Sequence, residues 1–284
     1  MIVELVTTGS ELLLGQIINT NSAYMARELN AIGFDVVYQT TVGDNRQRMQ
    51  EAIEHALQRA DIVITSGGLG PTQGDITKEV CAGVFGRSLV FNEECAARIR
   101  AHFQHLQRKM TESTLRQAMI PEGAHIFLNY AGTAPGVVLE QAGRLIVNLP
   151  GPPSEMKDMF DRSLRPYLEQ KYGFASVIVS RVLDTFGIGE SSLEMKIRDL
   201  ILAQKNPTLA LLVRPSGVIL RITAKAVDTA AAQLLIASME DEIRSRVGEY
   251  IYAADDENME DEVGSILQER GHTIDWAESR KGGL

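Results

Sequence analysis

The chain is organised around one stretch, Ile62-Val63-Ile64-Thr65-Ser66-Gly67-Gly68-Leu69-Gly70-Pro71-Thr72-Gln73-Gly74-Asp75-Ile76-Thr77-Lys78-Glu79. Its apolar beginning predicts a buried strand. The glycines that follow let the backbone turn at positive φ and approach a ligand closely. Asp75 and Thr77 offer oxygen ligands, or caps for the helix that comes next. Strand, glycine-rich turn and helix start are together typical of a phosphate-binding loop, although an ordinary strand-to-helix loop fits the same pattern.

The spacing differs from both common phosphate-binding motifs. No Gly-Lys-Ser/Thr follows the turn, as a nucleoside-triphosphate loop requires, and Gln73 stands where the dinucleotide fingerprint needs glycine. The pattern on either side is clearer, because apolar runs at 2–7, 35–42 and 62–66 alternate with helical patterns. Such alternation predicts parallel strands joined by right-handed crossovers. We therefore expect a doubly wound, mostly parallel α/β sandwich of three layers, with ligands bound at the carboxyl ends of its strands.

Two segments complete the predicted organisation. The first domain continues through helical patterns at 92–107 and 111–118, three short strands at 124–128, 137–140 and 145–149, and a helix that begins near Pro153. A β-α-β-β-α order after Tyr172-Gly173 predicts a small α+β module, with strands at 177–186, 208–213 and 218–226. Asn21 is the predicted cap of the first long helix.

Composition narrows the class of protein. The chain has 284 residues, 44% of them hydrophobic, and a net charge of -9, which suits two soluble domains and argues against a general nucleic-acid binder. Residues 171–253 contain ten basic and nine acidic side chains, so no basic stripe is present there for RNA or DNA. No apolar run approaches the ~20 residues of a membrane span, and no secretion signal is visible. Cys81 and Cys95 lack a Cys-x-x-Cys partner, which favours a reducing compartment, the cytoplasm.

Four motifs then give a resemblance to a known family. They are Thr8-Gly9-Ser10-Glu11-Leu12-Leu13-Leu14-Gly15-Gln16 with Asn19-Thr20-Asn21, Val42-Gly43-Asp44-Asn45, Gly67-Gly68-Leu69-Gly70-Pro71-Thr72, and Leu149-Pro150-Gly151-Pro152-Pro153-Ser154-Glu155-Met156. In this order and spacing, the chain closely resembles the competence-damage-inducible CinA family. The resemblance implies a molybdopterin-binding-like domain at 1–170, a KH-type module at 171–253, and a linker with the start of a truncated deamidase domain at 254–284.

The resemblance also implies an activity. Family members hydrolyse ADP-ribose to AMP and ribose 5-phosphate with a divalent metal, here Mg, Mn or Co, in the recycling of NAD and nucleotide metabolites. The expected partners are a small nucleotide substrate and a second copy of the chain in a homodimer, with no nucleic acid and no membrane. Two departures stand out: Gly74 replaces the first of two usual aspartates, and Arg280-Lys281 replaces Cys-Thr in the deamidase opening. Nicotinamide mononucleotide deamidation is therefore not expected.

The resemblance and the loop chemistry together select the candidate residues. Asp75 and Glu11 are the predicted catalytic groups, and Asp75 with Asp44 the predicted metal ligands. The predicted ligand- and phosphate-binding residues are Thr8, Gly9, Asn19, Asn21, Asp44, Asn45, Gly67, Gly68, Gly70, Pro71, Thr72, Thr77, Gly151, Pro152 and Ser154.

Each of these residues also has a plainer interpretation. Asp75 and Asp44 are possible helix caps, and Glu11 a solvated loop residue. Lys78 is expected to be solvated on its helix, and the pair His102 and His105, which lacks a third ligand nearby, to lie on a surface face rather than to bind zinc.

Three functions compete. The first is the metal-dependent ADP-ribose pyrophosphatase, in which a metal-bound water attacks phosphorus. The second is a non-catalytic module that binds a pterin or a nucleotide phosphate in the same pocket. The third is a degenerate CinA-like protein whose remaining role is dimerisation through the middle module.

Overall fold

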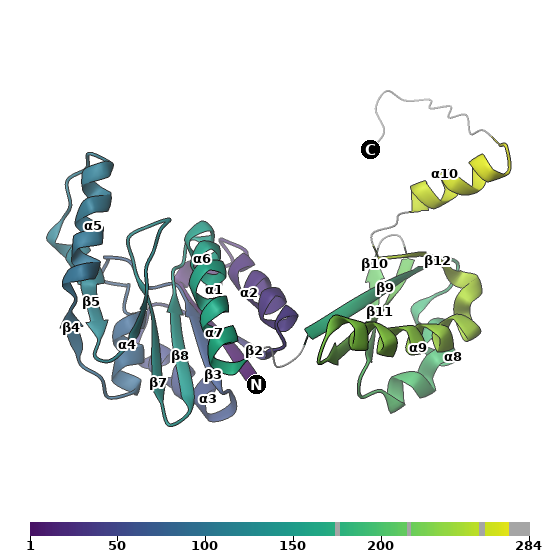
Figure 1. Ribbon diagram of the computed structural model, residues 1–284, viewed down its shortest axis with the longest axis horizontal. Helices are drawn as coiled ribbons and strands as arrows, with labels where there is room; N and C mark the ends of the chain where they lie inside the picture. The colour runs from purple at the N-terminus through teal and green to yellow at the C-terminus, as the bar shows by residue number, and fades with distance from the viewer. Residues whose placement is uncertain (174–176, 215–216, 256–258, 273–284) are drawn as a thin grey trace. The chain divides into compact units, whose positions relative to one another are not determined.

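The computed structural model describes residues 1–173, 177–214, 217–255 and 259–272. The chain divides into two compact units, Met1–Ala175 and Ser176–Leu284 (Figure 1). Each unit contains its own sheet and its own hydrophobic core.

The first unit is built on a six-stranded sheet in the order β2-β1-β3-β8-β7-β6. Strands β2, β1, β3 and β8 are parallel to one another, while β7 pairs antiparallel with β8 and β6 pairs antiparallel with β7. The strands are β1 (Ile2–Thr8), β2 (Asp35–Val42), β3 (Ile62–Ser66), β6 (His125–Phe127), β7 (Gly136–Gln141) and β8 (Arg144–Leu149). The mostly parallel doubly wound sheet predicted from the sequence is confirmed.

Helices cover both faces of this sheet (Figure 1). One face packs against α2 (Thr20–Ala31), α6 (Pro153–Met159), a π-helical turn (Phe160–Leu164) and α7 (Arg165–Tyr172). The other face packs against α3 (Arg46–Arg59) and α4 (Thr77–Val84). The predicted three layers are therefore present, and the strands that both layers enclose are apolar on both sides, as parallel strands require.

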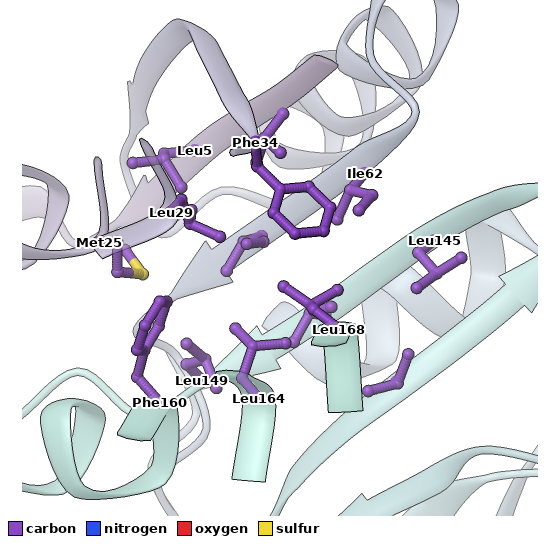
Figure 2. Close-up of a cluster of buried hydrophobic side chains, with 14 of the residues drawn as sticks. Leu5, Met25, Leu29, Phe34, Ile62, Leu145, Leu149, Phe160, Leu164 and Leu168 are labelled. Carbon is purple, nitrogen blue, oxygen red and sulfur yellow. The ribbon is translucent and has the colours of Figure 1, made fainter. Parts of the chain in front are cut away.

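Figure 2 shows the core of the first face, where Phe160, Leu164 and Leu168 point from the helical segment toward Leu145 and Leu149 on β8. All five side chains are fully buried. The apolar spacing along 156–168 is thus explained by a single helical stripe packed on the sheet. This packing fixes the end of β8 and the start of α6, which both border the site described below.

A small subdomain lies between β3 and β6 in the sequence. It contains β4 (Leu89–Phe91) paired antiparallel with β5 (Met119–Pro121), α5 (Glu93–His105), and a 3₁₀ helix (Glu112–Ala118). Its core includes Cys95, Ala96 and Ile99 of α5. Cys81 and Cys95 are both buried free thiols.

The second unit is a four-stranded antiparallel sheet in the order β10-β11-β9-β12. Two helices pack on it, and together the elements form the expected small α+β module. They are β9 (Val177–Thr185), α8 (Glu190–Ala203), β10 (Thr208–Arg214), β11 (Gly217–Ala226), α9 (Thr229–Val247) and β12 (Ile251–Ala254), followed by α10 (Met259–Glu269).

Two local predictions were wrong, and short strands were missed. Asn21 does not cap α2, because the side chain of Asn19 accepts the hydrogen bond from the Ser22 amide (3.1 Å) and helix α2 already begins at Thr20. Strand β12 was missed, since its four residues follow a helix directly and show no clear alternation. The predicted helix at 111–118 is a 3₁₀ helix that begins at Glu112.

Candidate functional site

The site lies where the connections of neighbouring strands leave the sheet in opposite directions. The segment after β1 leads to α2 on one face, whereas the segment after β3 leads to α4 on the other face. The segment after β8 returns to the first face through α6. Such switch points open a crevice at the carboxyl ends of the strands, which is where doubly wound sheets bind ligands.

The glycine-rich turn is held against β1 and α4. Gly67 has φ 110° and Gly68 has φ 66°, both of which favour glycine. A Cβ on Gly67 would lie 2.5 Å from the carbonyl oxygen of Thr8, and one on Gly68 would lie 2.1 Å from Oγ1 of Thr77. The Gly67 amide donates to the carbonyl of Leu149 (3.1 Å), and the Thr77 amide donates to that of Gly68 (3.2 Å). The sequence therefore has glycine here because the backbone lies too close to its neighbours for any side chain.

A buried polar network joins the three strand ends. The amide nitrogen of the Asn21 side chain donates to the hydroxyl of Ser66 (2.9 Å) and to the carbonyl of Gly151 (2.8 Å). The Ser66 hydroxyl in turn donates to the carbonyl of Pro150 (2.9 Å). Asn21 thus connects the segments after β1, β3 and β8, and its role in the structure is to hold these loops together.

Both aspartates of the site accept hydrogen bonds from loop residues, Asp44 from the segment after β1 and Asp75 from its own loop. Oδ2 of Asp44 accepts hydrogen bonds from the amide (3.0 Å) and the hydroxyl (2.8 Å) of Ser10. Oδ2 of Asp75 accepts from the amide of Thr72 (2.8 Å) and from its hydroxyl. In the part of the chain that the structure describes, no three His, Cys, Asp or Glu side chains gather into a group that could hold a metal. The donor set does not fit a metal site made by protein alone.

These loops enclose a cavity of about 620 Å³. Its charged lining consists of four carboxylates, Glu11, Asp44, Asp75 and Glu155, and none of the described residues that line it is Lys, Arg or His. A negatively charged ligand would have to be held there by backbone amides, hydroxyls and charges outside the lining.

Most of the predicted site residues line this cavity. They are Thr8, Glu11, Asn19, Asn21, Asp44, Gly67, Gly68, Gly70, Pro71, Thr72, Asp75, Gly151 and Pro152. Four others lie outside the lining. Gly9 is buried directly after β1, and Ser154 is exposed on α6. Asn45 caps α3, where its side chain accepts a hydrogen bond from the Arg48 amide (3.0 Å). The Thr77 hydroxyl is hydrogen-bonded to that of Thr8 (3.2 Å).

Sequence reasoning missed part of the wall. Thr133 and Ala134 line the cavity from the loop between β6 and β7, and Gln117 lines it from the 3₁₀ helix. Asn129 stabilises the loop between β6 and β7. Its side chain donates a hydrogen bond to Glu155 (2.7 Å) and accepts hydrogen bonds from the amides of Ala131 (3.0 Å) and Gly132 (2.7 Å). Of these residues, only Glu155 belongs to a sequence motif, whereas Gln117, Thr133 and Ala134 lie far from the motifs in the sequence.

Lys78 is not a solvated residue. It is 6% exposed, and its ammonium donates to the carbonyl of Gln117 (2.7 Å). Burial lowers the pKa of Lys78 to about 8, against smaller opposite effects of Cys95 and Glu79. The prediction was wrong because α5 and the 3₁₀ helix, which are distant in sequence, pack over the start of α4.

Comparison with known proteins identifies the family. Residues 4–170 match the model of a probable molybdopterin binding domain, and residues 180–253 match that of the damage-inducible protein CinA KH domain. A putative competence-damage inducible protein of Clostridium beijerinckii is 48% identical over 99% of this chain and 68% of its own length. The chain belongs to the CinA family.

Two further comparisons agree with this membership of the CinA family. A CinA-like protein of Dictyoglomus turgidum is 46% identical over 99% of this chain and 68% of its own length. The crystal structure of a protein CinA with unknown function from Thermoplasma acidophilum superposes with a TM-score of 0.54 at 32% identity and covers 60% of this chain and 96% of its own. The molybdopterin-binding-like first domain and the KH-type module follow from the two matched models.

The predicted ADP-ribose hydrolysis is wrong. The matched CinA-family models describe a molybdopterin binding domain and a KH domain, and none of the relatives named above is described as an ADP-ribose hydrolase. Asp44 and Asp75, the carboxylates chosen as metal ligands, both accept hydrogen bonds from loop residues of the site. The deamidase motif at 277–284 lies outside the described residues.

Among the residues that the structure describes, no helix combines the length and apolar character that crossing a bilayer requires.

Proposed function

We propose that the first unit binds a phosphate-bearing ligand of the pterin or nucleotide class in the 620 Å³ cavity. The observation that supports it most directly is the glycine-rich loop at the carboxyl end of β3, whose residues Gly67, Gly68 and Gly70 line the cavity. Backbone without side chains at a strand end and helix start is the form in which proteins approach phosphate most closely. The match to a probable molybdopterin binding domain gives the pterin half of this class.

The size and lining of the cavity agree with such a ligand. A volume of about 620 Å³ lies within the range of sites for molecules of nucleotide size. Ile17, Ile18 and the prolines Pro150 and Pro152 offer apolar surface for a ring system, whereas Thr8 and Thr72 offer hydroxyls. The carboxylates match the donor groups of such molecules, the ring amines and the ribose hydroxyls.

A divalent cation would be part of this site only if the ligand supplied some of its coordination. Mg²⁺ is commonly held by one or two carboxylates together with substrate phosphate oxygens. Asp44 and Asp75 are the residues that would serve, because both line the cavity. Binding compared with Mg²⁺ and with a chelator tests this point. The homodimer, the cytoplasmic location and the absence of nucleic-acid partners remain predictions.

The experiment is a calorimetric titration of the full chain with AMP and with adenosine, which lacks the phosphate. We expect AMP to bind more tightly than adenosine. Gly151→Val should weaken AMP binding, because even a Cβ there would lie 3.3 Å from Cα of Gly67 and a larger side chain would narrow the gap between the two loops. Gly189→Val is the matched control, since Gly189 lies in the second unit and a Cβ added to it would have no atom within 4 Å. Equal affinities for AMP and adenosine would contradict a phosphate site.

A further inference from the structure

The charged side chains that line the cavity are unfavourable for a phosphate. Its charged side chains are all carboxylates, so a phosphate that entered it would meet negative charge and no lining cation among the described residues. Backbone amides supply only partial charges. A full positive charge close to the glycine-rich loop would change this balance by a Coulomb energy that is large where water is excluded.

Lys78 lies directly behind that loop. A second, small cavity is lined by Lys78 and Arg116 together with Gly68, Leu69 and Gly70 of the loop, and also by Asp75, Glu79 and Gln117. The three loop residues line both cavities, as do Asp75 and Gln117, so these residues separate the space at Lys78 from the ligand space. The carbonyl of Gln117 accepts from the ammonium, and the side chain of Gln117 donates to the carbonyl of Leu69 (3.4 Å).

Among the described residues, no ion pair neutralises the charge of Lys78. Its neighbour Glu79 lies at 2.9 Å from Arg46 and at 3.0 Å from Arg116, which occupy its two oxygens. Cys95 of α5 acts on Lys78 only through its charge when ionised, and burial raises the pKa of this thiol, so it stays protonated near neutral pH. A buried ammonium whose hydrogen-bond acceptor is a neutral carbonyl is costly to keep, which indicates a role beyond packing.

We propose that Lys78 supplies, through the thin wall of Gly68, Leu69 and Gly70, the positive charge that attracts the phosphate of the ligand. Lys78 is thus a positioning residue that acts on the ligand without touching it. The inference rests on the proposed phosphate site, and it adds that the affinity of this site depends on one hidden cation. Because burial lowers the pKa of Lys78 to about 8, the protonated fraction of Lys78 should fall as the pH rises from 7.5 to 9.5, and the affinity for AMP should fall with it.

The test compares the wild type, Lys78→Met and Arg46→Met in calorimetric titrations with AMP and adenosine at constant Mg²⁺ and ionic strength. Methionine keeps the length and apolar stem of lysine, and Arg46→Met removes one positive charge from the exposed side of Glu79. We expect Lys78→Met to bind AMP about tenfold more weakly, in keeping with a charge acting over several ångströms at intermediate dielectric. Arg46→Met should change AMP affinity less than twofold, and adenosine affinity should stay the same in all three proteins.

A pH series separates electrostatics from structure. The phosphate of AMP has its second pKa near 6, so it is fully ionised above about pH 7.5 and does not itself titrate from there upward. Wild-type AMP affinity should fall between pH 7.5 and pH 9.5, while the affinity of Lys78→Met should stay flat. The same pH dependence in both proteins would overturn the inference even if Lys78→Met bound weakly. The outcomes are distinguishable: a wild type that binds no AMP contradicts the proposed function, whereas a wild type and a Lys78→Met that bind equally well contradict only the role of Lys78.

Discussion

Substituting Gly68 by alanine tests the packing of the loop against α4. Two terms destabilise the variant. A side chain at φ 66° is strained by about 1–2 kcal/mol. The added Cβ would also lie 2.1 Å from Oγ1 of the buried Thr77, and displacing this side chain adds about 1–3 kcal/mol.

Gly86→Ala is the matched control, because it carries the first term without the second. Gly86 has φ 62°, yet a Cβ there would have no atom within 4 Å. For a unit of this size, each kcal/mol shifts the melting temperature by about 2–4 °C. We therefore expect a decrease of about 10 °C for Gly68→Ala and about 4 °C for Gly86→Ala in the transition of the first unit.

The assay is differential scanning calorimetry of the full chain. The transition of the second unit serves as an internal reference, because neither substitution lies in it. A third variant, Gly68→Ala with Thr77→Ala, removes the obstructing hydroxyl and should recover part of the loss. Equal decreases for Gly68→Ala and Gly86→Ala, or no recovery in the double variant, would refute the close contact between the loop and α4.

Three further predictions concern other buried polar groups. Arg59→Ala should lower the urea midpoint of the first unit, because Arg59 makes two 2.8 Å hydrogen bonds to the fully buried Glu4, whose charge would lose its partner. Between pH 8 and pH 10.5 the wild type should gain about 3 kcal/mol of unfolding free energy relative to Lys78→Met. Burial lowers the folded-state pKa of Lys78 to about 8, so in this range the unfolded chain binds a proton that the folded chain has lost. Asn129→Ala should speed amide hydrogen exchange in the loop at 129–134, since the bonds to Glu155 and to two loop amides are lost.

Each of these has a contrary result. Arg100→Ala breaks only an exposed pair with Glu93, so a loss as large as that of Arg59→Ala would show that burial of the carboxylate does not matter. A pH-independent difference for Lys78→Met would mean that the ammonium is hydrated in solution. Unchanged exchange at 129–134, with the rest of the chain as reference, would show that the loop is held by other contacts.

The fold was predictable because its deciding signals are local. The apolar runs that became β1, β2 and β3 each end at a glycine-containing loop, so both the alternation and the edge at which the loops gather were visible in the sequence. The strands β4 and β12 were not visible, because three or four residues give too little alternation to distinguish a strand from a loop.

The site was only partly predictable, for a different reason. The residues of the loops after β1, β3 and β8 follow from the parallel topology, but Gln117 and Thr133 reach the cavity from segments whose place depends on tertiary packing. The sequence does not distinguish the roles of Asn19 and Asn21. Asn19 caps α2 and Asn21 joins the loops, and this difference depends on the residue at which the helix begins. Lys78 looks like an exposed helix residue until α5 is packed over it.

The most direct test of the proposed phosphate site is an NMR titration of the isotope-labelled chain with AMP and, separately, with adenosine. We expect AMP to shift the backbone amide signals of Gly68 and Gly70 strongly, and adenosine to shift them weakly, because the phosphate is the group that meets this backbone. Signals from β9 to β12 in the second unit should not move. The proposed function is contradicted if AMP leaves the amide signals of Gly68 and Gly70 unshifted, or if AMP and adenosine shift them to the same extent.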